Sequence, residues 1–241
     1  MKKFIALALA AMMLLSLVAC GENTDPTKAP TQPAGTEATT KAPDKTEAAN
    51  PDKTTAAQNE TKGGSSEAGN WETKGLPAVT AGCLEGRIAI TSIGQSADVD
   101  IIMKQLKKLK IDYYESKLME ASQLTTSYPI LICVVGGSTK GLGGAGLQQE
   151  DEEARVKALL EKAVELKTTV LMIHNGGVDR RGTLSDAFIK LAFPYSTYAI
   201  VKLEGDTDNL MHDILAAKNV PSAFVEKDAD VQAVMKYMFG K

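Results

Sequence analysis

The sequence predicts an α/β domain built on a doubly wound parallel sheet that helices cover on both faces. Strand-like and helix-like segments alternate about five times between Arg87 and Lys241, which is typical of parallel strands joined by helical crossovers. Residues 129–135 also form a continuous apolar run, as expected for a strand that is buried on both faces.

The first strand is expected over residues 87–93, and the first helix after the turn 94–96. Ser96 is a good N-cap for that helix. Residues 111–115 are expected to form a short second strand, and 118–127 to link it to the central strand. Within the helix, apolar residues recur at helical spacing and the lysines form a solvated face: Val99, Ile102, Met103, Leu106 and Leu109, with Lys104, Lys107, Lys108 and Lys110.

The central strand, residues 129–135, runs into a glycine-rich loop. Residues 136–146 contain six glycines. A loop of this kind either simply turns the chain or offers main-chain N–H groups to an anion.

The second half of the chain repeats the alternation. A helix opens with the carboxylates of residues 150–153, which favour the positive end of the helix dipole, and ends near Lys167. Residues 71–86 are expected as an irregular lead-in. The remaining elements are expected as strands at 168–174, 198–203 and 222–225, and as helices at 184–193, from the cap 205–209 to Lys218, and at 228–239.

This pattern predicts a flavodoxin-like three-layer sandwich with strand order 2-1-3-4-5 and possible addition of a sixth strand. Ligands of such sheets bind beyond the carboxyl ends of the strands, where the winding direction reverses. We therefore expect a site for a small anionic ligand there. The candidate residues are Ser92, Gly94, Gln95, Ser96, Gly136, Gly137, Ser138, Thr139, His174, Gly176, Arg180 and Arg181.

Cofactor motifs are incomplete, so no cofactor and no metal are expected. Thr91–Ser96 partly resembles a flavodoxin phosphate loop, but Ile93 replaces a hydroxyl residue and the loops 136–147 and 174–182 contain no aromatic residue for flavin stacking. Gly141, Gly143 and Gly146 match G-x-G-x-x-G but do not directly follow a first strand. A Walker A motif is absent from the sequence.

His174 is the alternative catalytic candidate, because a histidine at a strand end can act as general acid or base. Arg180 and Arg181 could then bind a ligand acid group. Structural roles are the competing interpretation: a hydrogen bond from His174 to a loop, and an ion pair that fixes the turn. Ser138 and Ser185 lack the G-x-S-x-G context of a nucleophile.

The N-terminus has the features of an export signal. Lys2 and Lys3 precede the apolar run 4–15, which is short for a spanning helix. Leu17–Cys20 resembles the lipobox of bacterial lipoproteins, and this resemblance implies cleavage after residue 19 and diacylation of Cys20. The competing interpretation is an ordinary signal peptide with a cysteine near the cut. The lipobox reading places the protein at the extracytoplasmic face of the cell membrane.

Residues 20–70 are expected to form a lipid-anchored, disordered linker between the signal peptide, 1–19, and the α/β domain, 71–241. Residues 21–70 contain no Val, Ile, Leu, Met, Phe, Tyr or Trp, so they have little to bury. A flexible chain of this length spans roughly 40 Å. Loss of Lys2 and Lys3 takes the formal net charge from -3 to -5, and nothing predicts nucleic-acid binding.

The two remaining cysteines, Cys83 and Cys133, are expected to be free thiols. Export permits a disulfide, but Cys133 falls in the middle of the predicted central strand and Cys83 in a loop before another strand.

Three segments together resemble a family of exported bacterial domains of unknown function, found largely in anaerobic Firmicutes. These are Thr91–Asp98, Val135–Gly143 and Arg180–Asp186, and the similarity covers most of residues 87–237. The resemblance implies the fold class and the extracytoplasmic setting but no activity.

Three functions remain open from the sequence. The leading hypothesis is a surface-tethered, non-enzymatic module that binds a small anionic solute. The second is an extracytoplasmic hydrolase or transferase using His174 with Arg180 or Arg181, and the third is a protein-interaction module with an inert crevice and an unknown partner.

Overall fold

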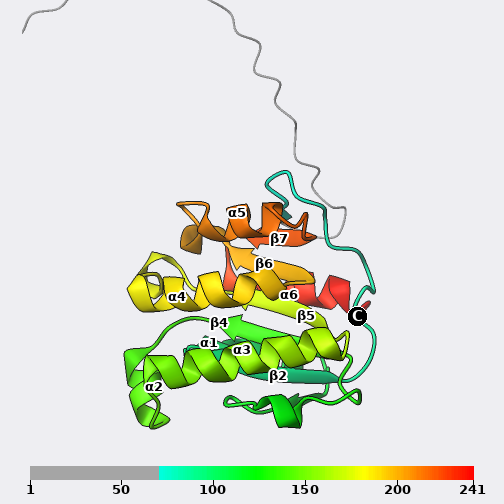
Figure 1. Cartoon of the computed structure of the whole chain (residues 1–241). Coiled ribbons are helices and arrows are strands. Elements are labelled where there is room, and N and C mark those ends of the chain that lie inside the picture. The colour runs from blue at the N-terminus through cyan, green and yellow to red at the C-terminus, as the bar shows by residue number, and fades with distance from the viewer. Residues whose placement is uncertain (1–70) are drawn as a thin grey trace, which may run out of the picture. The chain divides into compact units, whose positions relative to one another are not determined.

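Residues 71–241 are described by the computed structural model of the chain, and they contain one seven-stranded sheet with helices on both faces (Figure 1). The expected signal peptide, the expected linker and Cys20 lie outside the described residues. The strands are β1 (Trp71–Glu72), β2 (Ile88–Ile93), β3 (Tyr113–Glu115), β4 (Ile130–Val135), β5 (Thr169–His174), β6 (Tyr198–Lys202) and β7 (Ser222–Val225). The α-helices are α1 (Asp98–Lys108), α2 (Thr139–Gly144), α3 (Gln149–Glu165), α4 (Thr183–Ala192), α5 (Leu210–Ala216) and α6 (Asp228–Met238). Single 3₁₀ turns occur at η1 (Ala121–Gln123), η2 (Val178–Arg180), η3 (Phe193–Tyr195) and η4 (Leu203–Gly205).

The sheet has the order β1-β7-β6-β5-β4-β2-β3. Its six parallel strands lie in the order expected from the sequence, with the sixth strand added beyond the fifth. The sheet as a whole is not purely parallel, because β1 pairs antiparallel with β7 through Trp71 and Val225. This strand lies in the segment expected to be an irregular lead-in. Its two residues are too few to show alternation, but Trp71 is 95% buried and packs against Tyr237, with ring centroids 5.6 Å apart.

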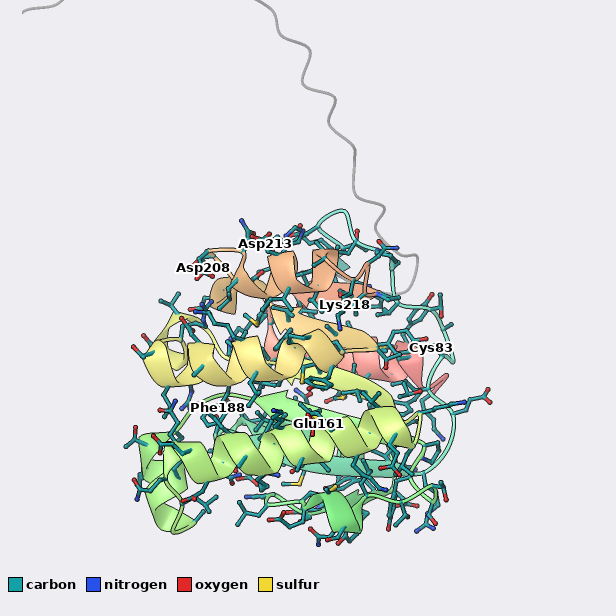
Figure 2. All side chains as sticks on the ribbon, viewed as in Figure 1. Cys83, Glu161, Phe188, Asp208, Asp213 and Lys218 are labelled. Carbon is teal, nitrogen blue, oxygen red and sulfur yellow. The ribbon has the colours of Figure 1, made fainter. Side chains whose placement is uncertain are left out.

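Helices α3, α4 and α5 cover one face of the sheet, whereas α1 and α6 cover the other. Figure 1 shows α3 and α4 in front of the strands, and Figure 2 shows Phe188 of α4 directed into the layer between helix and sheet, where it is fully buried. After β2 the chain passes to the face of the sheet that α1 covers, and after β4 it passes to the face that α3 covers. The winding therefore reverses between β2 and β4, as the sequence predicts.

The glycine-rich segment is not a loop throughout, because residues 139–144 form helix α2. Ser138 starts this helix: its Oγ accepts a hydrogen bond from the Gly141 N–H at 3.0 Å, and Leu142 is buried beneath it. A second correction concerns the start of α1. Its N-cap is Ala97, and Ser96 lies one position earlier, where its Oγ accepts the Asp98 N–H at 3.2 Å.

Cys83 and Cys133 are free thiols, which confirms the expectation. Cys133 is fully buried in β4, and this burial raises the pKa of its thiol to about 12. Among the helices of residues 71–241, none combines the length and the apolar character that crossing a membrane requires.

Candidate functional site

The two turns at the point of reversal are hydrogen-bonded to each other. Gln95 and Gly137 form an isolated antiparallel bridge, in which the Ser96 N–H donates to the Gly136 carbonyl at 3.1 Å and the Ser138 N–H to the Gly94 carbonyl at 2.8 Å. Gly94 has φ +82°, and a Cβ there would lie 2.7 Å from the Gly136 oxygen. The carboxyl ends of β2 and β4 are thus joined by main-chain contacts.

Other main-chain N–H groups of these turns are also satisfied within the protein. Gly94 donates to Glu152 Oε1 at 2.9 Å, Gly136 to the Ile93 carbonyl at 2.9 Å, and Gly137 to Ser185 Oγ at 3.0 Å. The expectation that these glycines hold out free N–H groups to an anion is therefore wrong. An N–H already bonded inside the protein would have to give up that partner first.

A buried carboxylate occupies the position that the sequence assigns to a ligand anion. Glu152 is fully buried, and its Oε1 accepts the Gly94 N–H, Gln95 Nε2 at 2.9 Å and Arg155 Nη2 at 2.7 Å. Arg155 also donates to the carbonyl oxygens of Met119 at 2.7 Å and Ser92 at 2.8 Å. Sequence reasoning treated Glu152 only as part of the acidic first turn. The available signal was its position four residues before Val156, on the apolar stripe of α3.

His174, at the end of β5, is fully buried. Its Nδ1 lies 2.9 Å from the Val135 carbonyl, which can only accept a hydrogen bond, so Nδ1 carries the proton and Nε2 is an acceptor. Burial lowers the pKa of His174 below its ordinary value of 6.5. His174 thus has a structural hydrogen bond, but to the end of strand β4 and not to a loop as expected.

Two consecutive residues carry three buried side-chain atoms that have no hydrogen-bond partner in the described part of the chain. These atoms are His174 Nε2 and the Nδ2 and Oδ1 of Asn175. Asn175 is 96% buried. Buried polar atoms normally find partners, so three unpaired atoms at one strand end are unusual. Asn175 was not among the residues predicted from the sequence, although it directly follows the strand.

Arg180 covers this strand end. A Cβ on Gly176 would lie 2.3 Å from Arg180 Cβ and 3.4 Å from His174 Cε1, so the arginine stem and the histidine ring pack on the same glycine. Arg180 Nε is 3.7 Å from Asp98 Oδ1, and Asp98 Oδ2 accepts the Ser96 hydroxyl at 2.7 Å. We call these residues the polar cluster: Ser96, Asp98, His174, Asn175 and Arg180.

Arg181 does not join the polar cluster but fixes the turn that carries it. It donates to Asp186 at 2.7 Å, to both oxygens of Asp208 at 2.9 Å and to the Gly205 carbonyl at 2.6 Å. Hydrogen bonding to Arg181 lowers the pKa of Asp208 to about 2 and also lowers the pKa of Asp186. Asp208 lies in the loop that precedes α5 (Figure 2). The structural interpretation of Arg181 is thus confirmed, whereas the Arg180 side chain remains 52% exposed.

The other candidate residues have local roles. Ser92 Oγ donates to the Ser96 carbonyl at 3.3 Å, Gln95 Nε2 also donates to the Lys117 carbonyl at 3.2 Å, and Thr139 is exposed on α2. Four hollows of about 250 to 370 Å³ are lined by described residues, and none of these four is lined by the polar cluster. Within residues 71–241, no three His, Cys, Asp or Glu side chains converge as metal ligands.

A wound α/β domain with a buried polar cluster at its strand carboxyl ends is the class of protein that these observations define. The profile of the family described as a domain of unknown function (DUF6305) matches residues 85–239. The chain belongs to this family. No curated protein matches the sequence.

Solved structures resemble the chain only distantly. A de novo designed Rossmann 2x3 fold protein is 9% identical, with 64% of this chain and 90% of that chain covered and a TM-score of 0.33. A GDSL-like lipase from Bacteroides thetaiotaomicron is 12% identical, with 57% and 67% covered and a TM-score of 0.27. The esterase AlinE4 is 10% identical, with 58% and 76% covered and a TM-score of 0.26.

Proposed function

We propose that the chain is an extracytoplasmic lipoprotein whose α/β domain binds a small anionic solute, without turnover, at the polar cluster. The single observation that carries this proposal is the group of three unpaired buried atoms on His174 and Asn175, with the half-exposed guanidinium of Arg180 on the same turn. The proposal places recognition on side chains, because the N–H groups of Gly94, Ser96, Gly136, Gly137 and Ser138 are already hydrogen-bonded.

The donors and acceptors of the polar cluster favour a solute that carries both an acid group and a hydroxyl group. Arg180 and the Asn175 amide N–H₂ can donate to a carboxylate or phosphate. His174 Nε2 can accept from a hydroxyl, since its ring proton is on Nδ1. A hydroxy acid or a phosphate ester with a free hydroxyl pairs with Arg180, Asn175 Nδ2 and His174 Nε2, whereas a simple carboxylate leaves Nε2 unpaired.

Binding requires the turn that carries Arg180 to move, because His174 and Asn175 are covered. The Arg180 stem rests on Gly176, and only the weak 3.7 Å pair with Asp98 holds its guanidinium. Arg181 anchors the other end of the turn to Asp186 and Asp208. The expected motion is therefore a local displacement of Arg180, with Arg181 as a fixed point.

The test is thermal unfolding of the purified chain with hydroxy acids (lactate, malate, citrate), glycerol phosphate, and the simple carboxylates acetate and succinate. A binding solute at about 100 times its Kd stabilises by about 2.7 kcal/mol, which corresponds to a rise in Tm of about 5 to 10 °C at this size. We expect a rise with a hydroxylated anion, its loss in Arg180→Ala, and its retention in the matched control Arg87→Ala.

Absence of any shift would contradict solute binding and favour the protein-interaction module. The enzyme alternative rests on the neutral His174 with its free Nε2 acceptor, which suits a general base. No hydroxyl or thiol of residues 71–241 is hydrogen-bonded to His174, however, so no activated nucleophile supports it. Solute binding that survives His174→Ala while turnover disappears would favour the enzyme.

Membrane attachment is part of the proposal and has its own test. The supporting features are the lipobox Leu17–Cys20 after a short apolar run and the linker without large apolar residues. Two acyl chains on Cys20 give stable anchoring. We expect the wild-type chain in the membrane fraction of a bacterial host with a diacylglyceryl mass increment at Cys20, and Cys20→Ala in the soluble fraction. A soluble wild-type chain would contradict the anchor.

We also propose that the domain is of the flavodoxin-like kind, on the basis of its six parallel strands.

A further inference from the structure

The edge of the sheet formed by β3 is open. β3 pairs with β2 on one side only, in the register Ala89 to Tyr114, and the Ser116 N–H donates to the Ile90 carbonyl at 3.2 Å. Successive residues of a parallel strand bond to opposite sides. Because Tyr114 and Ser116 bond to β2, Tyr113 and Glu115 turn their main-chain N–H and C=O groups away from the sheet.

Two hollows adjoin this open strand. One, of about 270 Å³, contains Tyr114 and Tyr128, which pack on the α3 side of the sheet. The other, of about 370 Å³, contains Lys107 and Lys110 with Tyr113, which packs on the α1 side. Asp112 and Tyr113 line both hollows. An added strand would point alternate side chains into the two hollows.

The first hollow has a preformed aromatic wall. The Tyr114 and Tyr128 rings are stacked at 5.1 Å and 22°, and the Arg87 guanidinium lies 5.1 Å from the Tyr128 ring centroid. Three of the six tyrosines of the chain line this hollow. Aromatic walls of this type accept proline or aromatic side chains.

The charge around the open edge is positive, although the chain carries a formal net charge of -3. Three basic side chains lie at the edge against the two carboxylates of Asp112 and Glu115, and two more lie farther along α1 in a groove that also contains Asp228 of α6. None of the five forms a salt bridge with a carboxylate of residues 71–241. The five are Arg87, Lys104, Lys107, Lys108 and Lys110.

We propose that β3 accepts an extended acidic segment of a partner protein as an added strand. The segment pairs its main chain with Tyr113 and Glu115, places an aromatic residue or proline against Tyr114 and Tyr128, and places a carboxylate between Lys107 and Lys110. Main-chain pairing supplies affinity and the two hollows supply selectivity, as in other cases of strand addition. This surface is separate from the polar cluster and does not depend on the proposed solute.

The test uses the full chain in detergent micelles and a fluorescein-labelled ten-residue peptide that alternates glutamate with valine and includes one tyrosine. Binding is measured by anisotropy and by amide hydrogen exchange. We expect saturable binding with slowed exchange at Tyr113 and Glu115. A second peptide with glutamine in place of glutamate should bind at least tenfold more weakly.

Charge reversal supplies the matched control. Lys107→Glu/Lys110→Glu should raise the Kd at least tenfold, whereas Lys190→Glu/Lys236→Glu, with the same net charge change at exposed positions on α4 and α6, should leave it unchanged. Equal weakening by both pairs, or binding without protection at Tyr113 and Glu115, would overturn the proposal. Dimerisation of the free chain that Glu115→Pro abolishes would overturn it in favour of a second copy as the occupant.

Discussion

Replacing Arg155 with methionine should destabilise the domain strongly, because Glu152 would keep a buried negative charge without its partner. Arg155 makes four hydrogen bonds of 2.7 to 2.8 Å, two to Glu152 and one each to the Met119 and Ser92 carbonyls. Breaking a buried pair by removing one member costs about 3–5 kcal/mol. The methionine stem retains much of the packing volume, so electrostatics rather than a cavity dominates the loss.

Urea unfolding followed by far-UV circular dichroism measures this effect. With a slope of about 2 to 3 kcal/mol per M, a loss of about 4 kcal/mol lowers the midpoint by about 1.5 M. The double variant Glu152→Gln/Arg155→Met should recover about half of the loss, because the remaining amide is neutral and its oxygen can still accept the Gly94 N–H.

The matched control lies on the same helix. Lys162 pairs with Glu165 at 2.8 Å, but the Lys162 side chain is 32% and the Glu165 side chain 66% exposed to solvent, so Lys162→Met should cost less than about 1 kcal/mol. A loss of less than about 1 kcal/mol in Arg155→Met, or no recovery in the double variant, would refute the assignment of Glu152 and Arg155 as a buried ion pair.

Three further predictions concern protonation, thiol reactivity and close packing. Because burial lowers the folded-state pKa of His174, the unfolded chain binds more protons below pH 6.5, and stability should fall as the pH drops below that value. His174→Gln should flatten this dependence and His212→Gln should not; the Asp208 contribution, present above pH 3.8, should disappear as the pH falls toward 2. Iodoacetamide with peptide mass spectrometry should modify Cys83 in the folded chain but Cys133 only after unfolding, and labelling of folded Cys133 would contradict its burial. Gly137→Ala should cost about 1–3 kcal/mol, because its Cβ would lie 2.7 Å from the Ser185 nitrogen. The control Gly143→Ala meets no atom within 4 Å and should be neutral or slightly stabilising in urea unfolding.

Most of the fold could be predicted because its signals are local and repeated. The run 130–135 is apolar at every position, and each later strand is followed by a segment of helical periodicity. The misses are the elements too short for a period to develop. Strand β1 has two residues, and α2 has six, three of them glycine, so its start depends on the single hydrogen bond of the Ser138 cap.

The location of the candidate site could be predicted from topology, but its chemistry could not. Glycine after a strand indicates a tight turn, yet it does not show which acceptors the main-chain N–H groups of that turn contact. In this chain the contacts come from residues distant in sequence, such as Glu152 for Gly94 and Ser185 for Gly137. His174 and Arg180 do lie together, whereas Arg181 is committed to Asp186 and Asp208.

Strand β1 also has a mechanical consequence. It is the first described element, so a pulling force arriving along the chain from the N-terminal side acts first on the two residues that join β7. The indole ring of Trp71 packs beside the Tyr237 ring, and this contact should oppose the force. Under tension β1 should detach before the six parallel strands are disturbed. Loss of β1 therefore need not open the polar cluster, which lies at the carboxyl ends of other strands.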